Sequence, residues 1–143
     1  MEYAHKTGSD MAKASNSSAP ISTKVAIEIS NHLRGMNTKK AKLFLEKVLK
    51  KEAAVPYKRF TEGAGHKPGK VGPGKYPQKA SEEFLNLIKT AENNAENQGL
   101  SEDLIIKHLV ANKAGNNFRY GRKARRKFKR THLQIILQEE QKE

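Results

Sequence analysis

The chain contains no cysteine and no tryptophan, and only 6% of its 143 residues are aromatic. The lack of cysteine excludes disulfides, thiolate zinc sites and cysteine nucleophiles, and it is typical of an intracellular protein. No apolar run approaches the roughly 20 residues that span a bilayer, and the polar N-terminus lacks the apolar segment of a signal peptide. With 36% hydrophobic residues, the chain can bury only a small core. We therefore expect a soluble protein of one domain.

Acidic residues are also scarce. The chain has 15 Asp and Glu against 28 Lys and Arg, which gives a formal net charge of +13 and a pI near 10.0. A pI above about 9 with clustered charge is the electrostatic footprint of nucleic-acid binding. An anionic membrane surface is the alternative partner. It is disfavoured because no expected helix combines a Lys/Arg face with large exposed aromatic residues.

The basic charge is densest between residues 112 and 130, a stretch without any acid. An apolar, β-branched segment at 104–111 precedes it, and alternating apolar residues at 133–137 follow it, so both flanks are expected to be β-strands. A basic loop between two strands predicts a projecting hairpin, whereas a disordered basic tail would not be followed by a patterned strand. Its charge needs a polyanion, and its aromatic rings offer faces on which bases stack. The basic residues are Lys113, Arg119, Arg122, Lys123, Arg125, Arg126, Lys127, Lys129 and Arg130.

Three helices are expected before the hairpin. Ser22 is a plausible N-cap for the first, with Val25, Ile29 and Leu33 on one face. Thr38 is expected to cap the second, whose lysines lie mostly opposite its apolar face and are either solvated or in contact with phosphate. The third and longest helix is expected to have Pro77 in its first turn and to run to about residue 98. Residues 1–10 are expected to be a flexible segment, with at most one poorly marked strand within 11–19.

The segment 56–76 is rich in Gly and Pro, and it is expected to be an extended basic loop. It has too little apolar content to fold alone, so we expect it to become ordered on a partner. Its Gly69–Lys75 stretch has the spacing of a phosphate-binding loop, but Tyr76 stands where Ser or Thr would hold Mg²⁺, and no apolar strand precedes it. A chance match is the better explanation. The basic and aromatic candidates here are Lys58, Arg59, His66, Lys67, Lys70, Lys75 and Tyr76.

Catalytic and metal-binding patterns are missing from the sequence. The five histidines show no metal-ligand spacing. The acidic pair Glu82-Glu83 falls in the opening turn of a helix, where negative charge complements the helix dipole. No arrangement of nucleophile, base and orienting group is present. We therefore expect no enzyme activity, no cofactor, no metal and no small-molecule substrate.

Several blocks of residues follow one another along the chain in a specific order. They are Leu33-Arg34-Gly35-Met36, Val55-Pro56-Tyr57-Lys58-Arg59-Phe60, Gly74-Lys75-Tyr76-Pro77, Ala91-Glu92-Asn93-Asn94-Ala95-Glu96-Asn97-Gln98-Gly99-Leu100, Asn112-Lys113-Ala114, Arg119-Tyr120-Gly121-Arg122 and Thr131-His132-Leu133. In this order the blocks resemble the archaeal and eukaryotic form of the large-subunit ribosomal protein family L-twenty-two, and the similarity covers about residues 11 to 140. The chain departs from the family pattern in its hairpin, which is several residues shorter on the ascending side, with Gly115-Asn116-Asn117 where longer relatives carry more basic residues.

This resemblance implies an α+β fold in which a small three-stranded antiparallel sheet packs against three helices and a β-hairpin projects. It implies a cytoplasmic, ribosomal protein that binds large-subunit ribosomal RNA, supports assembly, contacts neighbouring ribosomal proteins, and lines the nascent-peptide exit tunnel with its hairpin. The expected domain spans 11–143 and includes the basic loop 56–76 and the hairpin 104–138. Besides the basic residues above, the expected RNA-binding set includes Arg34, Tyr120 and His132.

A second function is compatible with the same residues. A free-standing RNA chaperone or regulatory RNA-binding protein would use the same basic hairpin. The two are separated by stable co-sedimentation with large subunits in high salt, because a transient chaperone would be washed off.

Overall fold

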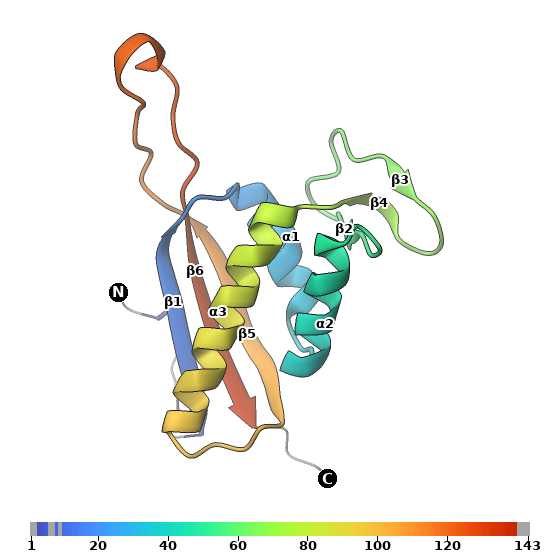
Figure 1. Cartoon of the computed structure of the whole chain (residues 1–143), viewed down its shortest axis with the longest axis vertical. Helices are drawn as coiled ribbons and strands as arrows, with labels where there is room; N and C mark the ends of the chain where they lie inside the picture. The colour runs from blue at the N-terminus through green and yellow to red at the C-terminus, as the bar shows by residue number, and fades with distance from the viewer. Residues whose placement is uncertain (1–2, 6–7, 9, 140–143) are drawn as a thin grey trace.

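A three-stranded antiparallel sheet forms one layer of the computed structural model, which describes residues 3–5, 8 and 10–139 (Figure 1). Its strands are β1 (Met11–Ala19), β5 (Leu104–Lys113) and β6 (Thr131–Glu139), in the order β1-β6-β5. β1 coincides with the weak strand expected within residues 11–19. The expected flexible segment 1–10 falls partly outside the described residues, and its flexibility stays a prediction.

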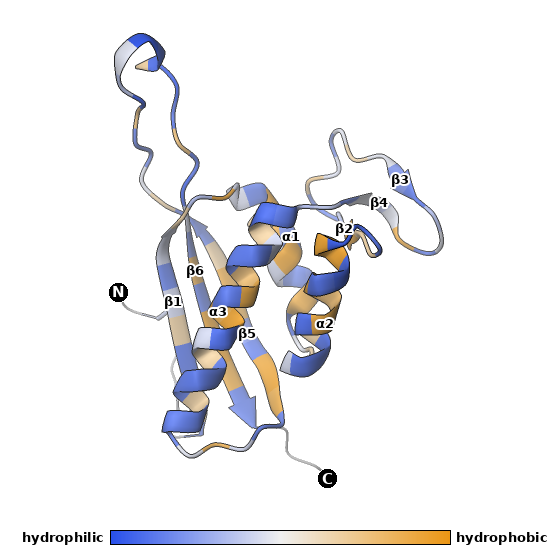
Figure 2. Ribbon diagram, in the orientation of Figure 1, coloured by the Kyte–Doolittle hydropathy of each residue, from blue (hydrophilic) through white to orange (hydrophobic). Residues whose placement is uncertain are grey.

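Three helices cover one face of this sheet: α1 (Thr23–Leu33), α2 (Thr38–Leu49) and α3 (Gln78–Asn97). α3 packs against β1 and β6, α1 packs against β5, and α2 packs against α3. Figure 2 shows polar and apolar residues on opposite sides of α3. The predicted apolar stripes form the core, in which Ile29, Leu45 and Ile88 are fully buried. The expected α+β fold with three helices on a three-stranded sheet is confirmed.

The helix ends follow the sequence signals with two exceptions, one in α2 and one in α3, where Pro77 is the N-cap residue and not part of the first turn. Ser22 is the N-cap residue of α1, although its side chain makes no capping hydrogen bond. Gly35, which follows α1, has a φ of 82°, a conformation that glycine adopts without the steric cost of a Cβ. α2 differs from the prediction, because its N-cap is Asn37 and not Thr38. The Asn37 side chain accepts a hydrogen bond of 2.9 Å from the Lys39 backbone N–H, which leaves Thr38 as the first helical residue.

The central strand β6 is buried on both faces, whereas its alternating pattern predicted a half-buried strand. The alternate apolar residues between 133 and 137 contact the helices, and Ile136 on the other face is also buried. Ala4, near the N-terminus, lies at that other face, where its backbone N–H donates to Gln134 Oε1 at 3.1 Å. The prediction of a half-buried strand is wrong because a segment distant in the sequence covers the outer face.

A second, smaller sheet was not predicted. It consists of β2 (Val55–Pro56), β3 (His66–Lys67) and β4 (Gly72–Lys75), in the order β2-β4-β3. A Cβ at Gly74 would lie 3.1 Å from the Val55 carbonyl oxygen, so glycine permits the close approach of β2 and β4. β2 and β3 have two residues each and β4 has four, which is too short to show an alternating apolar pattern, and the Gly and Pro content indicated a loop.

Candidate nucleic-acid interface

The hairpin formed by β5 and β6 continues beyond the sheet as a narrow arm, residues 114–130, that projects away from the helices (Figure 1). Backbone hydrogen bonds link its two sides: the Phe128 N–H donates to the Asn117 carbonyl and the Arg119 N–H donates to the Arg126 carbonyl, both at 2.8 Å. A single 3₁₀ turn, Gly121–Lys123, closes the end. The predicted projecting hairpin is therefore present and has a defined backbone path.

Cations and aromatic rings alternate along this arm. The Arg119 guanidinium lies 4.3 Å from the centre of the Phe128 ring, and the Lys127 ammonium lies 4.9 Å from that of Phe118. Such contacts contribute about 0.5–1 kcal/mol each at exposed sites. Tyr120 is 93% exposed and Phe118 is 59% exposed. The arm thus presents both positive charge and open ring faces to solvent, the combination that binds unstacked nucleotides.

The predicted basic residues of the hairpin divide into an exposed group and a base group. The exposed side chains are Lys113, Arg119, Arg122, Lys123, Arg125, Arg126, Lys127 and Lys129. At the base, Arg130 is half-buried and donates from Nη1 to the Ser18 carbonyl at 3.4 Å. His132 is half-buried within β6, with Nδ1 buried and without a hydrogen-bond partner. The structure therefore separates His132 from the exposed arm.

The second cluster of predicted residues is carried by the small sheet. Lys58 and Arg59 follow β2 after Tyr57 and are exposed, as are His66 and Lys70. Two further cations lie over aromatic rings: Lys67 Nζ is 4.9 Å from the Tyr76 ring centre, and Lys75 Nζ is 5.5 Å from that of Tyr57. The small sheet projects from the same end of the molecule as the arm (Figure 1).

A buried carboxylate, Glu28 of α1, fixes the position of this second cluster. Its side chain is 1% exposed and accepts hydrogen bonds from three consecutive backbone N–H groups, those of Lys58 (3.1 Å), Arg59 (2.8 Å) and Phe60 (2.6 Å). Hydrogen bonds to a charged acceptor contribute about 1.5–3 kcal/mol each. The sequence analysis missed Glu28. Its place next to the apolar stripe of α1 was the available signal, because a buried carboxylate needs donors.

Arg34 lies apart from both clusters. It follows the C-terminal end of α1, and its Nη2 donates to the Leu109 carbonyl of β5 at 2.8 Å. The side chain remains exposed while it makes this bond. The structure therefore places Arg34 against the edge strand of the main sheet and does not bring it to the end of the molecule where the arm and the small sheet project.

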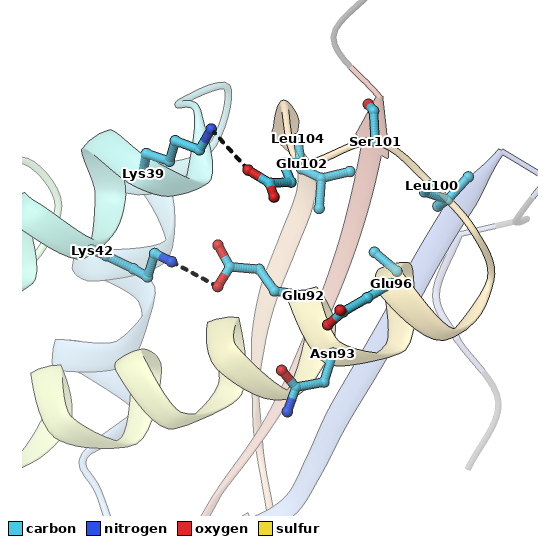
Figure 3. Close-up of a pocket in the computed structure, with 10 residues that line it drawn as sticks. Lys39, Lys42, Glu92, Asn93, Glu96, Leu100, Ser101, Glu102 and Leu104 are labelled. Carbon is cyan, nitrogen blue, oxygen red and sulfur yellow. Dashed lines mark hydrogen bonds and ion pairs between the residues drawn. The ribbon is translucent and has the colours of Figure 1, made fainter.

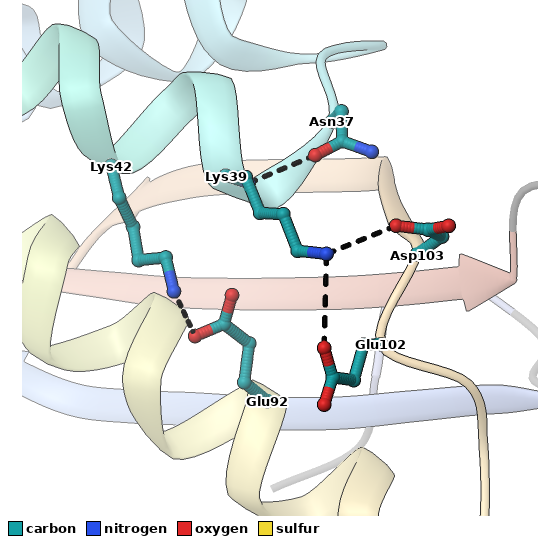
Figure 4. A network of polar contacts seen from close by, with 6 residues as sticks. All are labelled: Asn37, Lys39, Lys42, Glu92, Glu102 and Asp103. Carbon is teal, nitrogen blue, oxygen red and sulfur yellow. Dashed lines mark hydrogen bonds and ion pairs between the residues drawn. The ribbon is translucent and has the colours of Figure 1, made fainter.

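Acidic side chains gather at the end of the molecule opposite the arm, near the start of β5. A hollow between α2, α3 and the start of β5 is lined by the acids Glu92, Glu96 and Glu102 (Figure 3). The two lysines at its rim are paired with acids: Lys42 with Glu92 at 2.8 Å, and Lys39 with Asp103 at 3.1 Å (Figure 4). The hydrogen bond to Asp103 raises the pKa of Lys39. These two lysines of α2 are thus engaged with protein carboxylates.

The ion pairs between described residues all involve Lys39 or Lys42, and none includes a cation of the arm or of the small sheet. Within the described residues, the positive charge of the arm and of the small sheet is therefore not neutralised by ion pairs with acidic side chains. Within the same described residues, no cluster of three or more potential metal ligands occurs. No helix in this part of the chain is long and apolar enough to cross a bilayer.

Comparison with known proteins matches residues 14–138 to the family described as ribosomal protein L22p/L17e. A protein of Thermoplasma volcanium, the large ribosomal subunit protein uL22, is 44% identical over 123 residues, which are 85% of this chain and 82% of the relative. The uL22 protein of Thermoplasma acidophilum is 43% identical over the same length, with 85% and 81% of the two chains covered. That of Ignicoccus hospitalis is 39% identical, with 96% and 94% covered. With its three helices, its basic arm and most of its sheet inside the matched range, the chain belongs to the ribosomal protein L22p/L17e family.

Proposed function

We propose that this chain binds large-subunit ribosomal RNA, supports assembly of the large subunit, and contributes the hairpin 104–138 to the wall of the nascent-peptide exit tunnel. Family membership makes the chain a structural, non-enzymatic component of the large ribosomal subunit. The proposal adds the molecular contacts through which the chain would serve in that subunit.

The observation that carries the proposal is the arm, residues 114–130. It combines a dense set of exposed cations with open aromatic rings and contains no acid. Phosphate neutralisation would supply affinity, and the shape of single strands, bulges and helix junctions in the RNA would supply specificity. Because the arm has almost no buried apolar surface, the core of the molecule holds it at its base while RNA provides its contacts along its length.

The small sheet would form a second contact with RNA. Its cations at positions 58, 59, 67, 70 and 75 surround a segment with little core of its own. Glu28 and the cation–ring contacts hold its backbone in place, and RNA phosphates would reduce the repulsion between its charges. Neighbouring ribosomal proteins and, at the arm tip, the nascent peptide complete the proposed set of partners.

The proposal is tested in large subunits that contain this chain. The chain should remain with large subunits through a high-salt wash, and ultraviolet crosslinks should join its residues 113–130 and 58–76 to large-subunit RNA. Loss of the chain in high salt would favour the alternative, a free-standing RNA chaperone. Crosslinks confined to other parts of the chain would contradict the assignment of the arm and the small sheet.

A further inference from the structure

A hollow of about 500 Å³ lies where three parts of the molecule meet: the start of α1, the segment that follows β2, and the base of the arm. Its size falls within the range of ligand pockets, roughly 300–1,000 Å³. Four cations line it, namely Lys24, Arg59, Lys75 and Lys129, and Glu62 is an acid in its lining. The hollow therefore suits an anion, and it joins the two basic segments of the proposed RNA interface.

Two aromatic rings give this hollow a second property. Phe60 is half-buried, with Lys24 Nζ 5.6 Å and Arg59 Cζ 5.2 Å from its ring centre. Tyr57 is 4% exposed, and its hydroxyl has no hydrogen-bond partner in the structure. Burial, followed by the nearby charge of Glu28, raises the pKa of Tyr57 to about 12, so its hydroxyl stays protonated as a donor. Cations alone would be enough to bind an inorganic anion. Aromatic rings next to cations are in addition suited to bind a nucleotide, in which a base is attached to a phosphate.

The start of α1 adds to the attraction for a phosphate. Ser22, the N-cap residue, lines the hollow, and its side chain makes no capping hydrogen bond. The first turn of α1 contains no acidic residue, so no side chain of that turn neutralises the positive end of the helix dipole. The backbone N–H groups of a helix start are good phosphate donors. Together with the four cations and the Phe60 ring, they make the hollow suited to a phosphate with an attached base.

We propose that this hollow holds one unstacked nucleotide of the bound RNA, with its phosphate near Lys24, Lys129 and the start of α1 and its base against Phe60. This inference rests on the proposed function. RNA that contacts both the arm and the small sheet would have to pass between them, and the hollow lies at that junction. Unstacked bases in single-stranded segments are commonly bound by aromatic rings and Arg planes.

The test uses the full-length chain and a transcript of the large-subunit ribosomal RNA of Thermoplasma acidophilum. Ultraviolet irradiation of the complex should join a nucleotide to the peptide that contains Phe60, in addition to peptides of the arm. Phe60→Leu should weaken binding about fivefold or more, since stacking of one base contributes roughly 1–3 kcal/mol. Lys24→Gln should reduce the slope of log affinity against log salt by about 0.7–0.9, the value for one phosphate contact.

Two matched controls isolate the hollow. Phe44→Leu alters another half-buried phenylalanine, on α2, and Lys89→Gln removes an exposed lysine on α3. Both controls should bind like the unchanged chain. Thermal unfolding of Phe60→Leu checks that the variant is folded, and Lys24 is exposed, so its replacement tests the hollow without disturbing the core.

The outcomes separate the two proposals. If the arm crosslinks to RNA while the Phe60 peptide does not, and both variants bind unchanged, the hollow is not a nucleotide site although RNA binding stands. If the unchanged chain does not bind the transcript at all, the proposed function itself fails. A crosslink from the Phe60 peptide to an acidic segment of a neighbouring protein in intact subunits would also overturn the nucleotide assignment.

Discussion

At the scale of single residues, Glu28 should be among the most sensitive polar positions in the chain. Glu28→Gln removes the charge and one acceptor oxygen from a buried group that serves three backbone donors. We expect a decrease of about 2–3 kcal/mol in the free energy of unfolding, because a buried donor would lose its partner. Urea unfolding of the purified chain measures the effect. Hydrogen exchange should also accelerate at the amides of residues 58–60.

Glu46→Gln provides the control for this prediction. Glu46 is exposed on α2, and its replacement should change the free energy of unfolding by no more than about 0.5 kcal/mol. If Glu28→Gln were as mild as this control, the carboxylate would not be the group that holds the segment after β2.

His32 should make the stability of the chain depend on pH. Burial, and then the charge of Lys58, lower the pKa of His32 below its ordinary value of 6.5. The unfolded chain therefore binds more protons at this site than the folded chain does as the pH falls below 6.5. The free energy of unfolding should decrease from that pH down to the folded-state pKa, and it should be unaffected by this group at higher pH.

The contribution of His32 is measured by difference. Urea unfolding at a series of pH values should show a smaller loss of stability below pH 6.5 for His32→Gln than for the unchanged chain. His66→Gln, which alters an exposed histidine, should retain the full loss. Equal pH dependence in the His32 variant and the unchanged chain would contradict the assignment.

At the scale of elements, the tip of the arm should be dispensable for folding. Replacing Tyr120–Arg125 by a short Asn-Gly turn removes exposed residues only, and it leaves the strand pairs of β5 and β6 intact. The free energy of unfolding should change by less than about 1 kcal/mol. Subunits should still incorporate the shortened chain, while the reactivity of the tunnel wall toward chemical probes should change.

Two results would oppose this prediction. Unfolding of the isolated shortened chain would show that the tip belongs to the core. Unchanged tunnel reactivity in intact subunits would mean that the arm of this chain does not reach the tunnel wall, and the proposed tunnel contact would then have to be abandoned.

Elements with a repeating pattern were the ones that the sequence could predict. The stripe through Ile29 and Leu33 marked α1, and the apolar flanks of the basic stretch marked β5 and β6. The small sheet around Gly74 has strands too short to show any period. The positions of Glu28 and Phe60 depend on contacts between α1 and a segment about thirty residues later in the chain. No local sequence pattern could predict such contacts. The exposed cations of the arm could be predicted because a dense cluster of basic residues is recognisable in the sequence without knowledge of the fold.

At the scale of the whole molecule, RNA binding should depend steeply on salt. If about six to ten of the exposed cations meet phosphates, log affinity should fall against log salt with a slope of roughly −4 to −9. Filter binding or fluorescence anisotropy with large-subunit RNA, over a series of KCl concentrations, gives this slope. A slope near −1 or −2 would mean that most of the charge of the arm and the small sheet stays solvated.

The place of β6 in the sheet also governs when the protein can fold during its synthesis. β1, at residues 11–19, has β6, at residues 131–139, as its neighbour in the sheet, and Met11 is paired with Gln138. β1 therefore has no partner strand until residues 131–139 have been synthesised. Contacts so distant in sequence are slow to form, since a long loop must close first. α1, α2 and α3 are complete earlier, but the sheet that they cover can form only after translation has passed residue 139.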